Sequence, residues 1–407
     1  MVKPWDTATI GDFLDFKNGL NKGKEFFGYG TPIVNYTDVY RKRGLTKSDV
    51  RGKVNLTRDE IHRFDARKND VFFTRTSETP EEVGMSSVLL DDIDDCVFSG
   101  FVLRGRPKND MFVPEYCKYC FTTEAIRSAI IMGCTYTTRA LTNGTQLSAI
   151  ETVVPPKPEQ EAIAKSLTEI DDLISSLEKL ITKKKAIKQG AMQELLTGKR
   201  RLPGFNGAWQ VVKLEDICSK ITDGSHESPP ESDIGYYMPS VKDMRSTGFD
   251  YSECKKISYS DFKKLERNGC RPDVGDVLIA KDGSILKYAF VQEKAENIVI
   301  LSSIAIVTPH SDRVDSYFLA QYFRQQNFVE QVITSYKSGT GVPRIVLKRF
   351  KQIVLFIPES VAEQAAIAKI LVDMDIEITG LEKELAKYRQ VKQGMMQQLL
   401  TGKIRLV

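Results

Sequence analysis

The feature that most constrains this chain is a long stretch that occurs twice. Residues 159–202 align with residues 363–406 without a gap, at a shift of 204 (363 minus 159). Both copies begin Glu-Gln-x-Ala-Ile-Ala-Lys, and both end Lys-Gln-Gly-x-Met-Gln-x-Leu-Leu-Thr-Gly-Lys. Two copies are too few for a solenoid, which needs at least three repeats to bury a core. The repeat therefore predicts an internal pseudo-dimer.

Each copy has the apolar pattern of one long helix. Apolar residues recur at alternating spacings of four and three, a period typical of helices that supercoil about a partner. The seam consists of Ile163, Leu167, Ile170, Ile174, Leu177 and Ile181 in the first copy, and of Ile367, Leu371, Met374, Ile378, Leu381 and Leu385 in the second. We predict helices of about 38 residues, roughly 57 Å long, paired antiparallel with each other as a spacer. The alternative is two amphipathic helices that lie on separate cores.

Start and stop signals support these helices. Pro158 suits a first helical turn, and Ser360 with Glu363 forms the sequence of a capping box. Gly198 and Gly402 follow the two runs as stop signals.

Gly190 and Gly394 lie inside the two predicted helices at equivalent places, although each costs up to about 1 kcal/mol relative to Ala. We favour close packing of the two helices as the reason. A flat contact for a docked subunit is the alternative.

The composition is that of an ordinary globular protein. The chain has 407 residues, room for two or three domains, and a net charge of +4, which permits a polyanionic partner without requiring one. The sequence has no run of eighteen apolar residues, and its start does not resemble a signal peptide. Seven irregularly spaced cysteines suit the reducing cytoplasm. The pair Cys117 and Cys120 fits buried thiols on a helix over residues 114–131 better than a zinc site.

The rest of the chain predicts two α+β domains of similar fold. Residues 1–155 form the first domain, 156–202 its helix and turn, 203–358 the second domain, and 359–407 the C-terminal helix. In the first domain we expect strands over 70–74 and 96–103, helices over 57–67 and 114–132, and a non-helical boundary over 153–158. Trp209 follows Trp5 at the same shift of 204 as the helices.

Two segments of the first domain have counterparts in the second, although the domains are far less alike than the helices. Residues 29–38 correspond to 234–243, and Asp70-Val-Phe-Phe-Thr-Arg75 corresponds to Asp276-Val-Leu-Ile-Ala-Lys281. Similar helices joined to diverged domains indicate helices that face a common partner and domains that face different ones.

The sequence contains no motif for bond chemistry. The segment from Gly19 to Lys24 has a superficial phosphate-loop appearance, but its spacing is wrong and Glu25 follows it. The chain also has no dinucleotide fingerprint, no methyltransferase Asn-Pro-Pro-aromatic tetrad and no His-Glu-x-x-His. Paired carboxylates such as Glu81 and Glu82 lie in polar runs typical of solvated loops. We therefore predict no catalytic residues, no metal site and no cofactor in this chain.

Polar loops that follow strands are the candidate binding sites. Arg and Lys can pair with guanine edges or phosphates, Asn with adenine, and Thr with a thymine methyl or a phosphate. Any one loop could equally be an ordinary solvated turn, but equivalent loops recur in both domains. The candidate DNA-binding residues are Asn35, Tyr36, Thr37, Arg41, Arg43, Arg75, Thr76 and Arg139 in the first domain, and Lys242, Arg245, Lys281, Lys337 and Arg344 in the second.

The whole layout resembles the DNA-specificity subunit of type I restriction–modification enzymes. The resemblance rests mainly on the repeated helix, which carries Pro-x-x-Glu-Gln-x-x-Ile-Ala and ends in Leu-Leu-Thr-Gly-Lys. It implies that each domain recognises half of a split target in double-stranded DNA, and that the helices set the distance between the halves. It also implies docking of two modification subunits (adenine methyltransferases) and two restriction subunits, which would hold S-adenosylmethionine, ATP and Mg. One departure is Val361-Ala-Glu363, where the second copy lacks the double proline of the first.

Two other classes of protein remain as alternatives. A self-contained DNA methyltransferase with its own recognition domains would need cofactor motifs that the chain lacks. A coiled-coil scaffold without a nucleic-acid role would share the helices but would not bind DNA.

Overall fold

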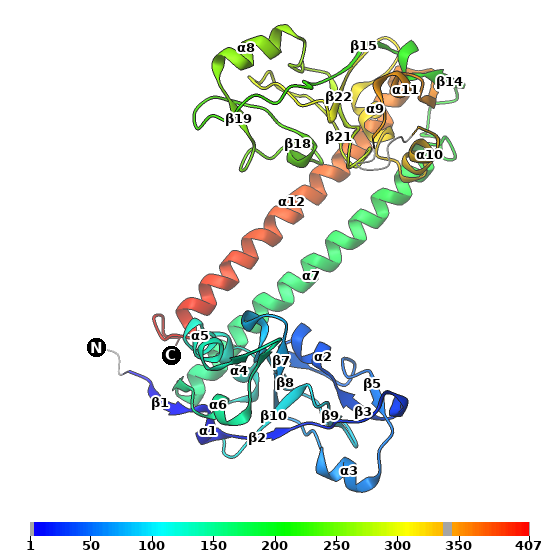
Figure 1. Ribbon diagram of the computed structural model, residues 1–407. Coiled ribbons are helices and arrows are strands. Elements are labelled where there is room, and N and C mark those ends of the chain that lie inside the picture. Colours follow the sequence, from blue (N-terminus) through cyan, green and yellow to red (C-terminus); the bar gives the residue numbers. More distant parts are fainter. Residues whose placement is uncertain (1–3, 337–343, 407) are drawn as a thin grey trace. The chain divides into compact units, whose positions relative to one another are not determined.

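The computed structural model describes residues 4–336 and 344–406 and divides into two compact units (Figure 1). The first unit combines the chain up to Leu177 with the chain from Leu385 onward, and the second is Glu178–Glu384. Each unit therefore contains one globular domain and part of each long helix. The boundary between the units crosses both long helices, so it does not coincide with the predicted segment boundaries. The division of the chain into four consecutive segments stays a prediction.

The first domain is built on a five-stranded sheet with the order β2-β10-β6-β8-β4. All its pairs are antiparallel except β4 with β8. The strands of this sheet are β2 (Leu14–Asn18), β4 (Gly44–Leu45), β6 (Val71–Thr74), β8 (Ser86–Leu89) and β10 (Val102–Pro107). Smaller sheets contain β1 (Asp6–Thr9), β3 (Phe27–Val34), β5 (Gly52–Val54), β7 (Thr76–Ser77), β9 (Val97–Phe98), β11 (Thr135–Tyr136), β12 (Ala140–Leu141) and β13 (Glu151–Val154). The short helices are α1 (Ile10–Phe13), α2 (Tyr36–Arg41), α3 (Arg58–Arg63), α4 (Pro114–Cys117), α5 (Glu124–Gly133) and α6 (Gly144–Ser148).

The second domain repeats the part β2-β10-β6-β8 of this sheet as β15-β22-β20-β21. These strands are β15 (Cys218–Asp223), β20 (Val277–Ala280), β21 (Ala289–Val291) and β22 (Ile304–Pro309). The remaining strands are β14 (Trp209–Lys213), β16 (Tyr236–Tyr237), β17 (Met244–Arg245), β18 (Gly248–Phe249), β19 (Lys256–Ile257) and β23 (Val354–Pro358). The helices are α8 (Tyr259–Arg267), α9 (Ser316–Tyr322), α10 (Gln326–Tyr336) and α11 (Leu347–Lys351). Because β14 pairs with β23 as β1 pairs with β13, the predicted relation between the two domains is confirmed.

Three predicted elements of the first domain are shorter or broken. The strand expected over 96–103 turns at Ser99, where a Cβ atom added at Gly100 would lie 2.0 Å from Asn21 Oδ1 and 2.9 Å from Leu20 O. The helix expected over 114–132 is divided because Thr123 has extended backbone and caps a new helix, α5. The helix expected over 57–67 ends at Arg63. The non-helical boundary predicted over 153–158 is also shorter than expected, because the long helix α7 begins at Lys157 and includes Pro158.

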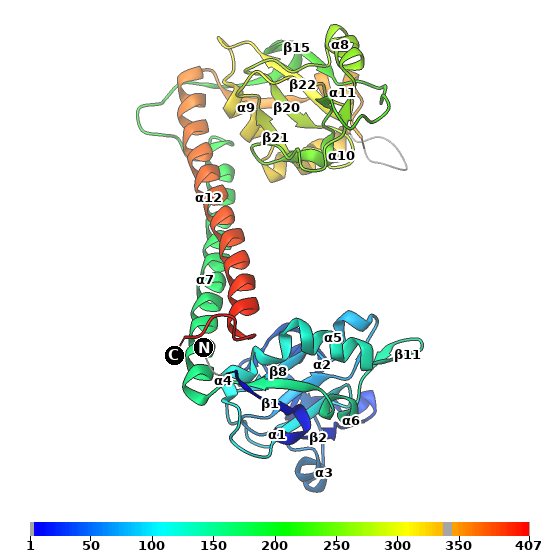
Figure 2. The same cartoon turned by 90° about the vertical axis from the view of Figure 1, so that its left-hand side faces the viewer.

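The two long helices are α7 (Lys157–Leu195) and α12 (Val361–Leu399), each of 39 residues, close to the predicted length. In each unit a stretch of α7 runs beside a stretch of α12 in the opposite direction (Figure 1; Figure 2). In the first unit Asp171 forms an ion pair with Lys392. In the second, Asp375 lies 2.6 Å from Lys188. The two pairs are equivalent under the shift of 204, so the internal repeat and the antiparallel pairing of the helices are confirmed within each unit.

The ends of the long helices close the domain cores. Ile163 and Leu167 from α7 pack in the core of the first domain with Leu399 and Leu400. Correspondingly, the start of α12 and the end of α7 pack in the core of the second domain. The outer residues of the predicted seam therefore pack in the domain cores. Four residues farther along the seam are buried outside those cores: Ile170, Leu177, Ile181 and Ile378.

The shared Glu-Gln opening of the repeat has a structural role at each helix start. The side chain of Gln160 accepts from Val113 N at 2.8 Å and donates to Pro155 O at 2.8 Å. Gln364 accepts from Asp315 N at 2.9 Å and donates to Pro358 O at 2.8 Å. Both amides are fully buried. They tie each helix to its domain.

Two sequence interpretations of the helices need correction. A Cβ atom added at Gly190 or Gly394 would meet nothing within 4 Å, so close packing of the two helices does not explain these glycines. The capping box of α12 is only half formed. Ser360 Oγ accepts from Glu363 N at 3.4 Å, but the Glu363 carboxylate pairs with Arg201 instead.

The thiols of Cys117 and Cys120 lie in the first core, as expected of small buried side chains. Among the described residues, no three His, Cys, Asp or Glu side chains are grouped closely enough to hold a metal ion. Within the same ranges, no helix has the length and apolar content that a bilayer crossing requires.

Candidate nucleic-acid interface

A buried aspartate begins the central strand of each domain. Asp70 accepts from Arg67 N at 2.7 Å, and Asp276 accepts from Asp273 N at 2.8 Å. Both are 1% exposed, and the four residues of β6 and of β20 that follow are all buried. The motif that begins with Asp70 or Asp276 therefore forms a hydrogen-bonded turn followed by a buried strand. It places the residue after the strand at the end of the sheet.

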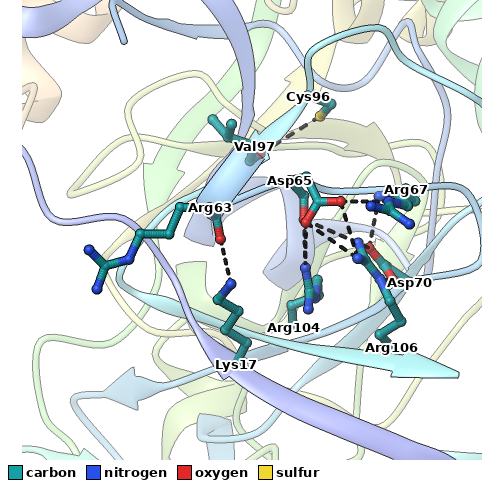
Figure 3. A network of polar contacts seen from close by, with 9 residues as sticks. All are labelled: Lys17, Arg63, Asp65, Arg67, Asp70, Cys96, Val97, Arg104 and Arg106. Carbon is teal, nitrogen blue, oxygen red and sulfur yellow. Dashed lines mark hydrogen bonds and ion pairs between the residues drawn. The ribbon is translucent and has the colours of Figure 1, made fainter. Parts of the chain in front are cut away.

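An internal network of charges supports this turn in the first domain (Figure 3). Arg106 donates to Asp70 at 2.8 and 2.7 Å and to Asp65 at 3.1 Å. Arg104, which is 4% exposed, donates to Asp65 at 3.0 Å. Burial opposes ionisation of Asp65, but the hydrogen bond and charge of Arg106 outweigh it and lower the pKa of that carboxyl. These arginines therefore neutralise Asp65 and Asp70 beneath the turn.

The residue after each central strand occupies the same backbone position in both domains. Arg75 N donates to Phe101 O at 2.9 Å, and Arg75 O accepts from Thr142 N at 3.0 Å. Lys281 N donates to Ser303 O at 3.0 Å, and Lys281 O accepts from Ile345 N at 3.1 Å. The equivalence of Arg75 and Lys281 inferred from the sequence is confirmed for the backbone.

In the first domain the predicted loops come together around Arg75. Thr76 lies on β7, which pairs with β12, and β12 pairs with β11 to form the hairpin that carries Arg139 at its turn. Helix α2 joins this group through Glu82, which accepts from Tyr40 Oη at 2.7 Å and from Ser77 Oγ at 3.2 Å.

The individual candidates around α2 differ in their surroundings. Asn35 caps α2 and is half-buried, and the Tyr36 ring stacks on Tyr40 at 5.8 Å. Thr37 and Arg41 are exposed, as is Arg139 on its hairpin. Arg43 lies apart from these loops, because its Nη1 contacts Met396 Sδ on α12 at 3.4 Å.

In the second domain Ser303 joins two of the predicted loops. Its Oγ accepts from Val241 N at 3.1 Å and its carbonyl accepts from Lys281 N. Lys242 is therefore placed near the end of β20, with its side chain exposed. Arg245, two residues beyond the 3-10 turn, pairs with Asp250 at 2.8 Å. Arg344 is exposed, and its backbone forms a bridge with Asp282. Lys337 lies outside the described residues.

The Lys281 side chain differs from the expectation. It is 4% exposed, and its ammonium lies 3.2 Å from Asp223 and 3.1 Å from Asp282. A buried ammonium held by two carboxylates is an internal structural group. Arg75, in contrast, is half-buried at the same backbone position.

Sequence reasoning missed one exposed aromatic residue in this region, Phe101, which is 56% exposed. The strand predicted over 96–103 includes it. The Ser-Gly pair before it was the available signal for a turn. Tyr136, on the hairpin of Arg139, is 58% exposed.

Comparison with known proteins identifies the architecture. The family model for the type I restriction modification DNA specificity domain matches the chain twice, over residues 2–189 and 206–392. The chain belongs to this family. The two matches confirm the predicted class of function, a specificity subunit of a type I restriction–modification system with two target-recognition domains.

The relatives cover nearly the whole chain. A putative type I restriction enzyme specificity subunit, MjaX, of Methanocaldococcus jannaschii is 25% identical, over 99% of this chain and 94% of its own. The MjaVIII specificity subunit of the same organism is 25% identical, over 99% and 93%. The crystal structure of an S subunit from M. genitalium has the same fold, with a TM-score of 0.60, 14% identity and 97% and 96% coverage.

Proposed function

We propose that this chain recognises a bipartite target in double-stranded DNA, one half with each domain, through the loops at the ends of β6 and β20. The observation that carries the proposal is the shared backbone position of Arg75 and Lys281, around which polar loops converge in both domains. A two-fold protein matches two half-sites. The first domain would use Arg75, Thr76, Arg139 and the exposed face of α2.

The second domain would use the exposed cations Lys242, Arg245 and Arg344. Lys281 would hold the loop in place through Asp223 and Asp282 and would not bind DNA itself. The helices would set the distance between the half-sites, because their ends are built into the domain cores.

We also propose that the chain is non-catalytic and works in a complex. Two modification subunits would dock on equivalent surfaces of the repeated helices, and two restriction subunits would complete the nuclease. S-adenosylmethionine, ATP and Mg would be bound by those partners, and the complex would act in the cytoplasm. Gly190 and Gly394 support this view, since each leaves open space on its helix.

Methylation and binding assays test the proposal. Purified chain alone should neither methylate nor cleave DNA, whereas the chain with its modification subunits should methylate adenines at a split target. Methyl transfer by the chain alone would favour a self-contained methyltransferase. Absence of DNA binding in the presence of the modification subunits would favour a scaffold.

A further inference from the structure

The Phe101 ring lies outside the hydrophobic cores of the part of the chain that the structure describes. It is 56% exposed, belongs to none of the hydrophobic clusters and contacts no other aromatic ring. Single exposed apolar residues are common on proteins. Phe101 differs from them in how firmly its backbone is held and in what surrounds it.

Hydrogen bonds fix the turn that carries Phe101. Val102 N donates to Ser99 O at 2.9 Å, which closes the turn. Gly100 N donates to Leu20 O at 2.7 Å, and Phe101 O accepts from Arg75 N at 2.9 Å. A side chain at Gly100 would collide with Asn21 Oδ1, at 2.0 Å from the added Cβ. The ring is therefore presented to solvent from a rigid base.

This turn adjoins Arg75 in the candidate interface of the first domain. The same Arg75 that holds Phe101 also accepts, through its carbonyl, from Thr142 at the end of β12. That strand belongs to the hairpin of Arg139. Phe101 lies opposite Arg75, next to the antiparallel pair of Val102 with Thr74, and opposite residues project from the same face of a sheet. We therefore expect a DNA duplex that touches Arg75 to reach the Phe101 ring.

The second domain has the same turn with different chemistry. Ile304 N donates to Leu301 O at 3.1 Å, and Ser302 N donates to Ser225 O at 2.9 Å. Ser303 occupies the place of Phe101, and its hydroxyl accepts a hydrogen bond from Val241 N. The same turn therefore carries the apolar Phe101 ring in the first domain. In the second domain it carries the Ser303 hydroxyl, which has a hydrogen-bond partner.

We propose that Phe101 reads a thymine in the half-site of the first domain, by apolar contact with the 5-methyl group. Phe has no hydrogen-bonding group, and the thymine methyl is the apolar group that base pairs present in the major groove. Arg and Thr side chains, which suit base edges and phosphates there, flank the turn. The inference rests on the proposed function of this face.

The test uses the chain in complex with its modification subunits and duplexes of the methylated target. Each thymine of the first half-site is replaced in turn by deoxyuridine, which pairs identically but lacks the methyl group. At one position wild-type binding should weaken by roughly 4-fold, the effect of removing one buried methyl group. The Phe101→Ala variant should bind the thymine duplex as weakly as the wild type binds the deoxyuridine duplex. It should not distinguish thymine from deoxyuridine at that position. Phe101→Leu should retain the distinction.

Each other result overturns the inference. A first half-site without thymine on either strand does so at once. So does a Phe101→Ala variant that binds normally, or one that binds weakly but still distinguishes thymine from deoxyuridine, as a ring wedged between base steps would. Val211→Ala, which removes a residue 70% exposed on β14, is the control and should bind normally.

Failure of this inference can be distinguished from failure of the proposed function. If Arg75→Ala and Arg139→Ala weaken the first half-site while Phe101→Ala does not, only the role of Phe101 is wrong. If all three bind normally, the proposed face is wrong.

Discussion

Glu159 and Arg405, which are 246 residues apart, form a two-pronged ion pair with both N···O distances at 2.5 Å. The carboxylate also accepts from Trp5 Nε1 at 3.0 Å, and the guanidinium lies over the Trp5 ring at 5.0 Å. Burial raises the pKa of Glu159, but the bonds from Arg405 and Trp5 outweigh burial and lower it. Glu363 and Arg201 repeat the pair in the second unit, at 2.6 and 2.8 Å. In each unit, therefore, an ion pair joins the start of one long helix to the segment that follows the end of the other long helix.

Arg405→Met should destabilise the first unit by about 3–5 kcal/mol, because it leaves the Glu159 carboxylate buried without its partner. Denaturant unfolding followed by Trp5 fluorescence, in a Trp209→Phe background, measures the first unit, since the chain has only two tryptophans. Lys403→Met, which changes an exposed cation nearby, is the control and should unfold as the parent does. Equal midpoints for the Arg405 variant and the control would contradict this role of the pair.

Arg75→Ala and Arg139→Ala should impair recognition of one half-site and leave the other unchanged. A contact with a base edge discriminates by about 1–3 kcal/mol at one position, whereas a phosphate contact weakens binding uniformly and reduces its salt dependence. Lys242→Ala and Arg344→Ala should do the same for the other half-site. Methylation of target variants by the reconstituted complex measures both effects. Unaltered specificity in all four variants would mean that another face binds DNA.

Lys281→Met should act through stability instead of through recognition. It leaves Asp223 and Asp282 facing each other without the ammonium between them, a loss on the order of 3–5 kcal/mol for a buried pair. Unfolding of the second unit, followed by Trp209 fluorescence in a Trp5→Phe background, measures the loss. Lys242→Met is the exposed control. A Lys281 variant of normal stability that fails to recognise its half-site would show that the ammonium binds DNA.

The stability of the second unit should depend on Lys188 at alkaline pH. Burial and the nearby Arg324 lower the pKa of Lys188 to about 8, although Asp375 opposes the shift. Above pH 8 the unfolded chain, with a lysine pKa near 10.5, binds more protons than the folded chain, so stability rises with pH between these values. The unfolding free energy of the wild type relative to Lys188→Met should therefore increase by up to about 3 kcal/mol over this window. A constant or falling difference would contradict the assignment.

Much of the fold follows from sequence pattern. The heptad seam and the repeat predict both long helices and their pairing, because period and identity can be read without coordinates. The break at Ser99 could not be predicted with the same ease, since it depends on the close approach of Gly100 to Leu20, a contact that is remote in sequence. Similarly, the use of Ile163 and Ile367 in domain cores cannot be distinguished by pattern from their use in a coiled coil.

The candidate site shows the same limit. The strand motif located Arg75 and Lys281 at equivalent backbone positions. The direction of each side chain depends on its neighbours in space, which the motif does not reveal. In the second domain, Asp223 lies 3.2 Å from the Lys281 ammonium and holds it inside the protein. The sequence therefore did not reveal that the Lys281 side chain is buried or that Phe101 is exposed on a turn.

Helix length provides the most direct test of the central claim, that the helices measure the gap in a split target. Four residues inserted after Leu180 alone would shift α7 against α12, because Asp171 and Lys188 pair with α12 on opposite sides of that point. Matched insertions after Leu180 and after Glu384 keep both pairs and lengthen each helix by roughly 6 Å. That length corresponds to about two base pairs at 3.4 Å each.

Sequencing of methylated adenines in a host that carries the doubly inserted chain and its partners gives the answer. The account predicts unchanged bases in both half-sites and a gap one or two base pairs longer. Exchange of residues 5–155 for the equivalent domain of a relative should instead change one half-site and keep the gap. Altered bases with an unchanged gap in the insertion variant would contradict the claim that the helices set the spacing.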